Sequence, residues 1–293
     1  MLQIVSSALG RWPTRRLLAV LAFGGSSAGC LVTAPEAAEA PQGPKPAEEL
    51  RVTGGIPGAV VDVSSIRGQP GVAEYDLPVA GQGTRSVVVW LPETPEPRAM
   101  VLLLHGTVRE RKGHAAGAQP GPSRLLVSCL AAPALGFLDP IILAPSSPTG
   151  QWWARSDTEL VLGLVLAARD RWPAARTRSV ILGYSNGGIG AWYFARLYPE
   201  YFRAAIPMAF NDTIVGPSTL PIYAIQGTKD EQFAFPAVRA AIQALHDQGQ
   251  DVTLDEKYRG AHNAPCSYVP ELGRAGHWLV DHVYARSESA GSP

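Results

Sequence analysis

Apolar runs and helical repeats alternate along most of this chain. Residues 100–104 and 141–143 form short, continuously apolar runs, which are typical of parallel strands buried on both faces. Residues 157–171 place apolar side chains at helical spacing, with Asp157 in position to cap the helix. This alternation predicts an α/β fold in which helices flank a mainly parallel sheet.

The remaining elements follow from the same patterns. We expect further strands at 85–92, 204–208, 222–226 and 252–258, and helices at 123–130, 236–248 and 269–284. Ser123 is a candidate N-cap, and Pro236 suits the first turn of a helix. Residues 56–63 and 71–78 fit either short strands or loop. The connection at 209–220 is too short to hold a large lid.

The first part of the chain does not have the pattern of a packed domain. In residues 1–30, arginines precede an apolar run that is too short to span a bilayer, which predicts a cleavable export signal. The segment 27–30, Ser-Ala-Gly-Cys, resembles a bacterial lipobox, although that motif usually has leucine in place of Ser27. The signal therefore ends either at a lipidated Cys30 or by ordinary cleavage near Ala28.

Composition limits the rest of the chain to one domain. Proline-rich residues 31–50 predict a disordered linker, and residues 287–293 predict a flexible tail. The segment 51–286, of about 235 residues, fits a single α/β domain with a well-buried core. Basic and acidic residues number 25 each, and this zero net charge argues against a nucleic-acid binder, which normally has a basic excess.

Residues 179–194 carry the pattern that most restricts the function. Strand-type residues lead into Gly-Tyr-Ser-Asn-Gly at 183–187, and a helix-compatible segment follows directly. A serine at the apex of such a turn has a strained backbone, and Gly183 and Gly187 omit β-carbons that would clash beside it. The helix would direct its free N–H groups toward charge developing on an attacked carbonyl. Ser185 is therefore a candidate nucleophile.

Two further polar residues follow strands at the carboxyl edge of the predicted sheet, where α/β proteins bind ligands. Asp230 follows one strand and His262 follows the last one, the only one of six histidines in such a place. A serine hydroxyl needs a base to take its proton, histidine has a suitable pKa, and a carboxylate fixes the tautomer of that histidine. Glu231 and Asp212 remain alternatives to Asp230 as the acid.

Main-chain groups and a tryptophan pair complete the candidate site. The N–H groups of Asn186, directly after the serine, and Thr107, after His-Gly at the end of the 100–104 strand, are candidates for an oxyanion hole. Trp152 and Trp153 fall in a loop at the carboxyl end of a strand. They either line a substrate pocket or pack in the interior.

Cysteines and glycines carry less information. If Cys30 bears lipid, Cys129 and Cys266 remain as a pair that either forms a disulfide or stays as two buried thiols. The sequence has no metal-ligand motif, and the glycines at 187–190 do not have the spacing of a dinucleotide fingerprint. We therefore expect neither a metal nor another cofactor.

Four motifs occur in the order Leu-His-Gly-Thr, Gly-Tyr-Ser-Asn-Gly-Gly, Gly-Thr-Lys-Asp-Glu and Gly-Ala-His-Asn. Together they resemble the α/β-hydrolase superfamily, whose catalytic residues follow the chain order serine, acid, histidine. The nearest branches are the phospholipase/carboxylesterases and the esterases similar to polyhydroxybutyrate depolymerases or feruloyl esterases. The resemblance implies an α/β-hydrolase fold with a minimal lid and a metal-free serine hydrolase that uses Ser185, Asp230 and His262 through an acyl-enzyme.

The expected function is that of an exported bacterial carboxylesterase acting on small-molecule or polymeric esters. It would be a periplasmic or cell-surface lipoprotein attached to the membrane through Cys30, or a secreted protein. One alternative is a peptidase similar to prolyl oligopeptidases, although no gating domain precedes Arg85. Another is a non-catalytic surface binding protein that uses a hydrolase fold. The motifs do not identify the ester or the acyl group.

Overall fold

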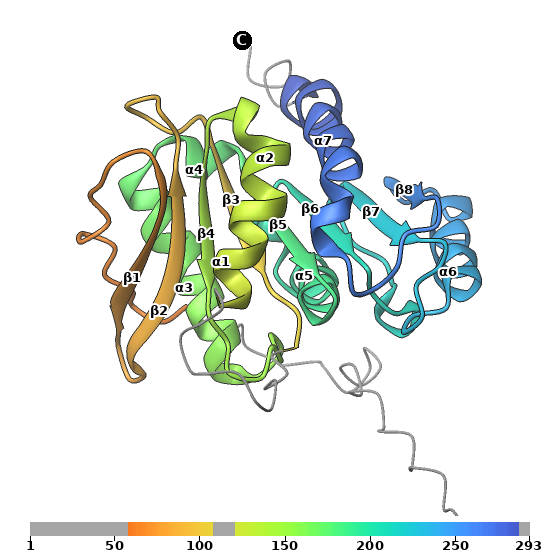
Figure 1. Cartoon of the computed structure of the whole chain (residues 1–293), viewed down its shortest axis with the longest axis horizontal. Helices are drawn as coiled ribbons and strands as arrows, with labels where there is room; N and C mark the ends of the chain where they lie inside the picture. The colour runs from red at the N-terminus through yellow and green to blue at the C-terminus, as the bar shows by residue number, and fades with distance from the viewer. Residues whose placement is uncertain (1–57, 108–120, 287–293) are drawn as a thin grey trace, which may run out of the picture. The chain divides into compact units, whose positions relative to one another are not determined.

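The computed structural model describes residues 58–107 and 121–286 (Figure 1). The expected export signal, the candidate lipid site Cys30, the 31–50 linker and the 287–293 tail lie outside the described residues. The structure therefore concerns the α/β domain. No helix among the residues described is long and apolar enough to cross a membrane.

One eight-stranded sheet runs through the described part of the chain, in the order β1-β2-β4-β3-β5-β6-β7-β8 (Figure 1). Its strands are β1 (Gly71–Val79), β2 (Gly83–Leu91), β3 (Ala99–Leu104), β4 (Pro140–Pro145), β5 (Ser179–Tyr184), β6 (Ala204–Met208), β7 (Ile222–Gly227) and β8 (Val252–Lys257). β2 pairs antiparallel with both β1 and β4, whereas all other neighbours pair in parallel. The prediction of a mainly parallel sheet is confirmed.

Helices pack against both faces of this sheet. They are α1 (Pro122–Leu126), α2 (Ala132–Leu135), α3 (Arg155–Arg171), α4 (Ala174–Thr177), α5 (Asn186–Leu197), α6 (Phe235–Asp247) and α7 (Val269–Trp278). One core cluster joins the sheet to α3, α5 and α6, and the other joins it to α1, α2 and α7. In β3, Leu102 belongs to the first cluster and Leu103 to the second, and both are fully buried. Burial on both faces explains why the strand is apolar throughout.

The segment left open between strand and loop at 71–78 is strand β1. It pairs with β2 at nine positions, from Gly71 opposite Leu91 to Val79 opposite Gly83. Glu74 and Asp76 are exposed whereas Leu77 and Val79 are buried, so one side of this strand faces solvent and the other faces the core. Its pairing with β2 resolves the choice between strand and loop that the sequence left open.

Two expected helix caps are wrong. Ser123 lies inside α1, and its hydroxyl donates to the main-chain oxygen of Pro145 at 2.9 Å. Asp157 lies in the first turn of α3, after the N-cap position at Ala154, and its carboxylate is buried. Both side chains bind partners in distant segments instead of the N–H groups at their own helix end, so tertiary contacts override the local capping preference.

Candidate active site

A sharp turn at Ser185 joins the central strand β5 to helix α5. Ser185 has φ of 58° and ψ of −123°, a backbone conformation that is strained for a residue other than glycine. Its N–H donates to the main-chain oxygen of Met208 at 3.0 Å, which ties the turn to the neighbouring strand β6. The strand–turn–helix expected from the sequence is present, with its serine in the strained position.

Two glycines make this turn sterically feasible. A β-carbon at position 183 would overlap the main-chain oxygen of Gly187, and one at position 187 would overlap the main-chain oxygen of Leu104 in β3. Both obstacles are backbone atoms, which cannot rotate away as a side chain can. The predicted role of Gly183 and Gly187 in omitting β-carbons is confirmed.

Three side chains from distant parts of the chain meet above the carboxyl edge of the sheet. Ser185 Oγ lies 2.9 Å from His262 Nε2, and His262 Nδ1 lies 2.9 Å from Asp230 Oδ2. The side chains of His262 and Asp230 are 4% and 0% exposed. An ionised carboxylate only accepts, so Nδ1 carries the proton and Nε2 is free to accept the serine proton. The hydroxyl, the imidazole and the acid thus form a continuous hydrogen-bonded chain.

Asp230 is the acid in contact with the imidazole, and each of its oxygens has two donors. Oδ1 accepts the N–H groups of Gln232 and Phe233 at 2.9 and 2.8 Å. Oδ2 accepts from Gln226 Nε2 at 3.1 Å in addition to His262. A buried carboxylate needs such partners to remain charged. Gln226 was not singled out in the sequence, although a glutamine closing a buried apolar strand is a signal of a polar function there.

Neither alternative acid, Glu231 or Asp212, is hydrogen-bonded to the imidazole. Glu231 binds main chain next to the imidazole: its Oε2 accepts the N–H of His262 at 3.0 Å, and its Oε1 accepts from Asn263 Nδ2 at 2.7 Å. The hydrogen bond from the His262 N–H is the main cause that lowers the pKa of Glu231 below its ordinary value. Asp212 begins a short 3₁₀ turn after β6. Glu231 therefore holds the histidine loop from outside without touching the imidazole.

The inner side of the same loop is held by a tyrosine. The hydroxyl of Tyr184, the last residue of β5, donates to the main-chain oxygen of His262 at 2.8 Å. Burial raises the pKa of Tyr184, so the hydroxyl stays protonated and can donate. The ring of Phe233 also packs edge-on against the imidazole, with 5.0 Å between the ring centres. His262 is thus restrained on its ring and on both sides of its main chain.

A disulfide closes the segment that follows the histidine. Cys129 and Cys266 are bonded, with their Cα atoms 5.1 Å apart, which decides between the two alternatives that the sequence left open. Cys266 is exposed and lies four residues after His262 in the chain, whereas Cys129 belongs to the helical segment between α1 and α2. The bond therefore anchors the histidine loop to a helix on one face of the sheet.

The two candidate oxyanion donors belong to two segments that meet at the nucleophile. Asn186 is the first residue of α5, so its N–H has no acceptor within the helix. Thr107 follows Gly106, where a β-carbon would lie 2.9 Å from the Ser185 β-carbon and 3.4 Å from its Oγ. The end of β3 therefore runs directly against Ser185.

His105 supports this end of β3. Its Nε2 accepts the N–H of Ser147 at 2.9 Å, and its Nδ1 donates to the main-chain oxygen of Gly106 at 2.6 Å. Burial lowers the pKa of His105, which agrees with a neutral ring that donates from one nitrogen and accepts at the other. The carbonyl of Gly106 and the N–H of Thr107 belong to one peptide unit, so holding the first orients the second.

Trp152 is a packing residue. It is fully buried, its ring lies edge-on to His105, and its Nε1 donates to the main-chain oxygen of His105 at 2.8 Å. The reading of Trp152 as part of a substrate pocket is therefore wrong, because a fully buried ring cannot meet a ligand. Trp153 is half-buried and stays a candidate for the pocket.

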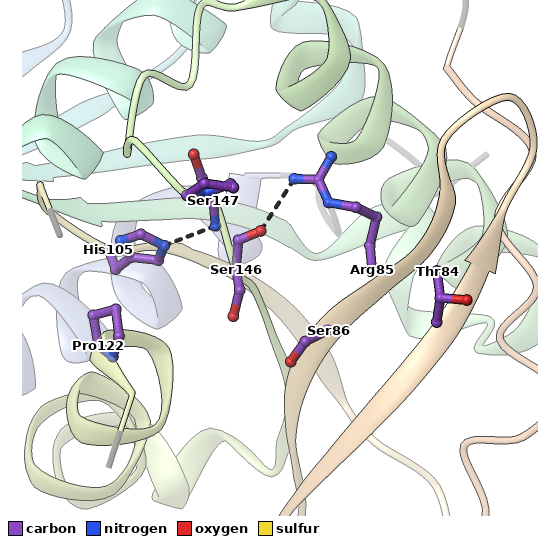
Figure 2. A pocket seen from close by; sticks show the side chains of 8 residues that line it. Thr84, Arg85, Ser86, His105, Pro122, Ser146 and Ser147 are labelled. Carbon is purple, nitrogen blue, oxygen red and sulfur yellow. Dashed lines mark hydrogen bonds between the residues drawn. The ribbon is translucent and has the colours of Figure 1, made fainter. Parts of the chain in front are cut away.

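A pocket of about 330 Å³ lies beside His105 (Figure 2). It is lined by Thr84, Arg85, Ser86, His105, Pro122, Ser146, Ser147 and Pro148. Two of these residues bind Asp157, which accepts from Arg85 Nη2 at 2.6 Å and from Ser147 Oγ at 2.5 Å. Figure 2 shows the Ser147 nitrogen directed at the ring of His105. The buried Asp157 thus fixes Ser147, which in turn holds His105.

Within the described ranges, no group of three or more histidine, cysteine or acidic side chains could hold a metal ion. The site consists of a hydroxyl, an imidazole, a carboxylate and main-chain donors. These are the groups of nucleophilic catalysis with a general base.

The chain matches no protein-family model and no curated protein. Solved structures do resemble it. An S-formylglutathione hydrolase (FrmB) from Staphylococcus aureus has 15% identity and a TM-score of 0.57, over 72% of this chain and 99% of that one. FphF, a fluorophosphonate-binding serine hydrolase of the same organism, has 15% identity and a TM-score of 0.55, over 76% and 99%.

A thermostable esterase has 20% identity and a TM-score of 0.52, and the similarity covers 72% of this chain but only 62% of the esterase. At these identities the likeness concerns the fold. The parallel sheet, its flanking helices and these neighbours together show that the domain has the α/β-hydrolase fold.

Proposed function

We propose that this protein is a serine hydrolase that cleaves carboxylic esters through an acyl-enzyme. The observation that carries the proposal is the hydrogen-bonded chain from Ser185 through His262 to Asp230, with 2.9 Å at each step. The esterases and serine hydrolases among the similar structures support it.

The geometry suits a two-stage reaction. His262 Nε2 takes the proton of Ser185 as the hydroxyl oxygen attacks the ester carbonyl, and the resulting imidazolium is stabilised by Asp230. The imidazolium then gives its proton to the leaving alcohol, which leaves an acyl group on Ser185. Water activated by the same imidazole hydrolyses this acyl-enzyme and restores the serine.

The oxyanion formed in both stages would be bound by the N–H groups of Asn186 and Thr107. Asn186 opens helix α5, so the positive end of the helix dipole adds to its hydrogen bond. Thr107 is oriented from behind by His105, which binds the carbonyl of the same peptide unit. One such donor stabilises a transition state by about 3–4 kcal/mol.

The substrate would be a soluble or polymeric ester. Residues 209–220 between β6 and β7 contain only a three-residue 3₁₀ turn, so this connection holds no large lid of the kind that would shelter a long lipid chain. Half-buried Trp153 is the candidate aromatic side chain for contact with the acyl or alcohol group.

We place this activity outside the cytoplasm. The bond between Cys129 and Cys266 is typical of an oxidising compartment, in agreement with the export signal that residues 1–30 suggest. Lipid attachment at Cys30 would retain the protein at the membrane. Cells fed labelled palmitate should then label the wild-type protein and not the Cys30→Ala variant, and an unlabelled wild-type protein would instead favour cleavage near Ala28.

Hydrolysis of short p-nitrophenyl esters by the purified domain tests the activity, with Ser185→Ala as the control. We expect turnover by the wild-type protein and a loss on the order of 10⁴-fold or more in the variant. Equal rates would remove the assignment of Ser185. Preference for prolyl amides over esters would favour a peptidase, and failure of a fluorophosphonate to label Ser185 would favour a non-catalytic binding protein.

A further inference from the structure

Gln226 is a polar side chain at the end of a strand that is otherwise buried and apolar. It belongs to β7 (Ile222–Gly227), every residue of which is buried, and Gln226 itself is 0% exposed. A buried amide without partners is costly. The hydrogen-bond partners of Gln226 therefore indicate its structural role.

The partners determine which end of the amide faces which group. Oε1 accepts the N–H of Phe210 at 3.1 Å, and an N–H can only donate. Nε2 faces two acceptors, Asp230 Oδ2 at 3.1 Å and the main-chain oxygen of Phe233 at 3.3 Å. Reversing the amide would set acceptor against acceptor and donor against donor, so the NH₂ group must point at the carboxylate.

The NH₂ group of Gln226 and the imidazole of His262 meet on the same carboxylate oxygen. Asp230 Oδ2 accepts from both of them, and Oδ1 is held by two main-chain N–H groups. The main chain therefore fixes one oxygen and Gln226 fixes the other. With both oxygens held, the carboxylate cannot rotate away from the imidazole.

We propose that Gln226 is a positioning residue for the hydrolysis: its amide holds the Asp230 oxygen that receives the Nδ1–H of His262, and so keeps Nε2 aligned with Ser185. This inference rests on the proposed function. Gln226 is fully buried behind Asp230 and cannot touch a substrate. Its loss should therefore lower kcat and leave KM nearly unchanged.

Two variants remove the donor in different ways. Gln226→Glu keeps an oxygen for the N–H of Phe210 but sets a second oxygen against Asp230 Oδ2. Gln226→Met has a similar length and no donor. Matched controls come from Gln243 on α6, whose Nε2 also donates to a carboxylate, Asp247 Oδ1, at 2.8 Å, but at an exposed surface. Gln243→Glu and Gln243→Met change the same chemistry away from the site.

Steady-state hydrolysis of p-nitrophenyl acetate gives kcat and KM, and thermal unfolding shows that each variant is folded. For the Gln226 variants we expect kcat on the order of 10- to 100-fold below wild type, with KM within about twofold. Labelling of Ser185 by a fluorophosphonate should slow in parallel, because it uses the same base. The Gln243 variants should match wild type. A folded Gln226 variant with wild-type kcat would overturn the proposal.

A measurement on the wild-type protein covers the case in which the variants do not fold. When Ser185 reacts with a fluorophosphonate, its oxygen bonds to phosphorus, fluoride leaves, and the serine proton passes to His262 beside Asp230. In ¹⁵N-labelled protein the side-chain amide signals of Gln226 should shift on this reaction, and those of Gln243 should not. Unmoved Gln226 signals would reject the positioning role. Wild-type protein that neither hydrolyses esters nor reacts with the fluorophosphonate would instead reject the proposed function itself.

Discussion

The turn that carries the serine and the loop that carries the histidine are held in place by different means. Ser185 sits between a strand and a helix that are continuous with it, and the close contacts around it are between backbone atoms. His262 follows strand β8 but has no helix directly behind it. Side chains from other segments hold it instead: Asp230, Glu231 and Tyr184 by hydrogen bonds, and Cys129 through its disulfide to Cys266 in the histidine loop.

The serine turn is therefore held by residues that are neighbours in the chain, whereas the histidine loop is held by contacts with distant segments. The serine turn needs glycines at two positions, because other residues would collide with main chain. The histidine loop needs several side chains at once, and each supplies part of the restraint. Changes in the turn should therefore act on folding, whereas changes around the loop should be graded and act mainly on catalysis.

The largest effect is expected from the acid that touches the imidazole. Asp230→Asn should lower kcat on the order of 10³- to 10⁴-fold, because an amide no longer favours the tautomer with a proton on Nδ1. Steady-state kinetics on p-nitrophenyl acetate measure this. Glu231→Gln is the matched control, since Glu231 binds main chain rather than the ring. Equal losses in the two variants would show that the acid has been misassigned.

The next largest effect, on stability, is expected from adding a β-carbon at a glycine of the Ser185 turn. Gly187→Ala should lower the free energy of unfolding by more than about 3 kcal/mol, because the new β-carbon would overlap the main-chain oxygen of Leu104. Chemical denaturation measures the change. Gly273→Ala in α7 is the control, because the nearest atom outside its own helix would lie 3.9 Å from the new β-carbon, and it should stabilise by up to about 1 kcal/mol. Equal behaviour of the two alanines would refute the steric argument.

The disulfide should have an intermediate effect. The double variant Cys129→Ser/Cys266→Ser should lose about 2–4 kcal/mol of unfolding free energy, since the bond closes a long loop of chain. Its kcat should also fall, because the segment after His262 loses its anchor. Reductant should reproduce both changes in the wild-type protein and add nothing to the double variant. Full activity after reduction would show that the hydrogen bonds alone hold the loop.

The smallest effect is expected from substitutions of Glu231, whose carboxylate is exposed. Glu231→Ala should lower kcat about tenfold by releasing hydrogen bonds that each contribute about 0.5–1.5 kcal/mol. Glu231→Gln keeps an acceptor, so its kcat should fall less.

The pKa of Glu231 lies below its ordinary value. Its charge therefore stabilises the fold at pH values above the ordinary pKa, and this stabilisation is lost as the pH falls through the lowered pKa.

The thermal stability of wild type and Glu231→Gln should consequently converge in acid and differ near neutral pH, by a small amount because the group is exposed to solvent. Thermal unfolding over a pH series measures this. A difference that grows in acid would reverse the assigned sign.

Much of the fold and the three central residues of the site could be predicted from local patterns. The buried strands β3 to β7 are apolar over nearly their whole length, and the serine turn is encoded within about 16 residues. Asp230 and His262 were found because parallel strands bring their carboxyl ends to one edge. The caps expected at Ser123 and Asp157 were wrong, and the choice between pocket and packing for Trp152 stayed open, because the partners of these side chains lie in other segments. Residues 71–78 were left open between strand and loop, although their partner β2 follows directly in the chain.

The sequence by itself determined the α/β order of elements, the glycine-flanked serine and the candidate acid and base, since each depends on residues that are neighbours in the chain. Only the tertiary structure decided that Cys129 pairs with Cys266, that Glu231 binds main chain, and that Gln226 supports Asp230. The physical reason is that a hydrogen bond or a disulfide requires atoms a few ångströms apart, and residues far apart in the sequence reach that distance only when the whole sheet has assembled.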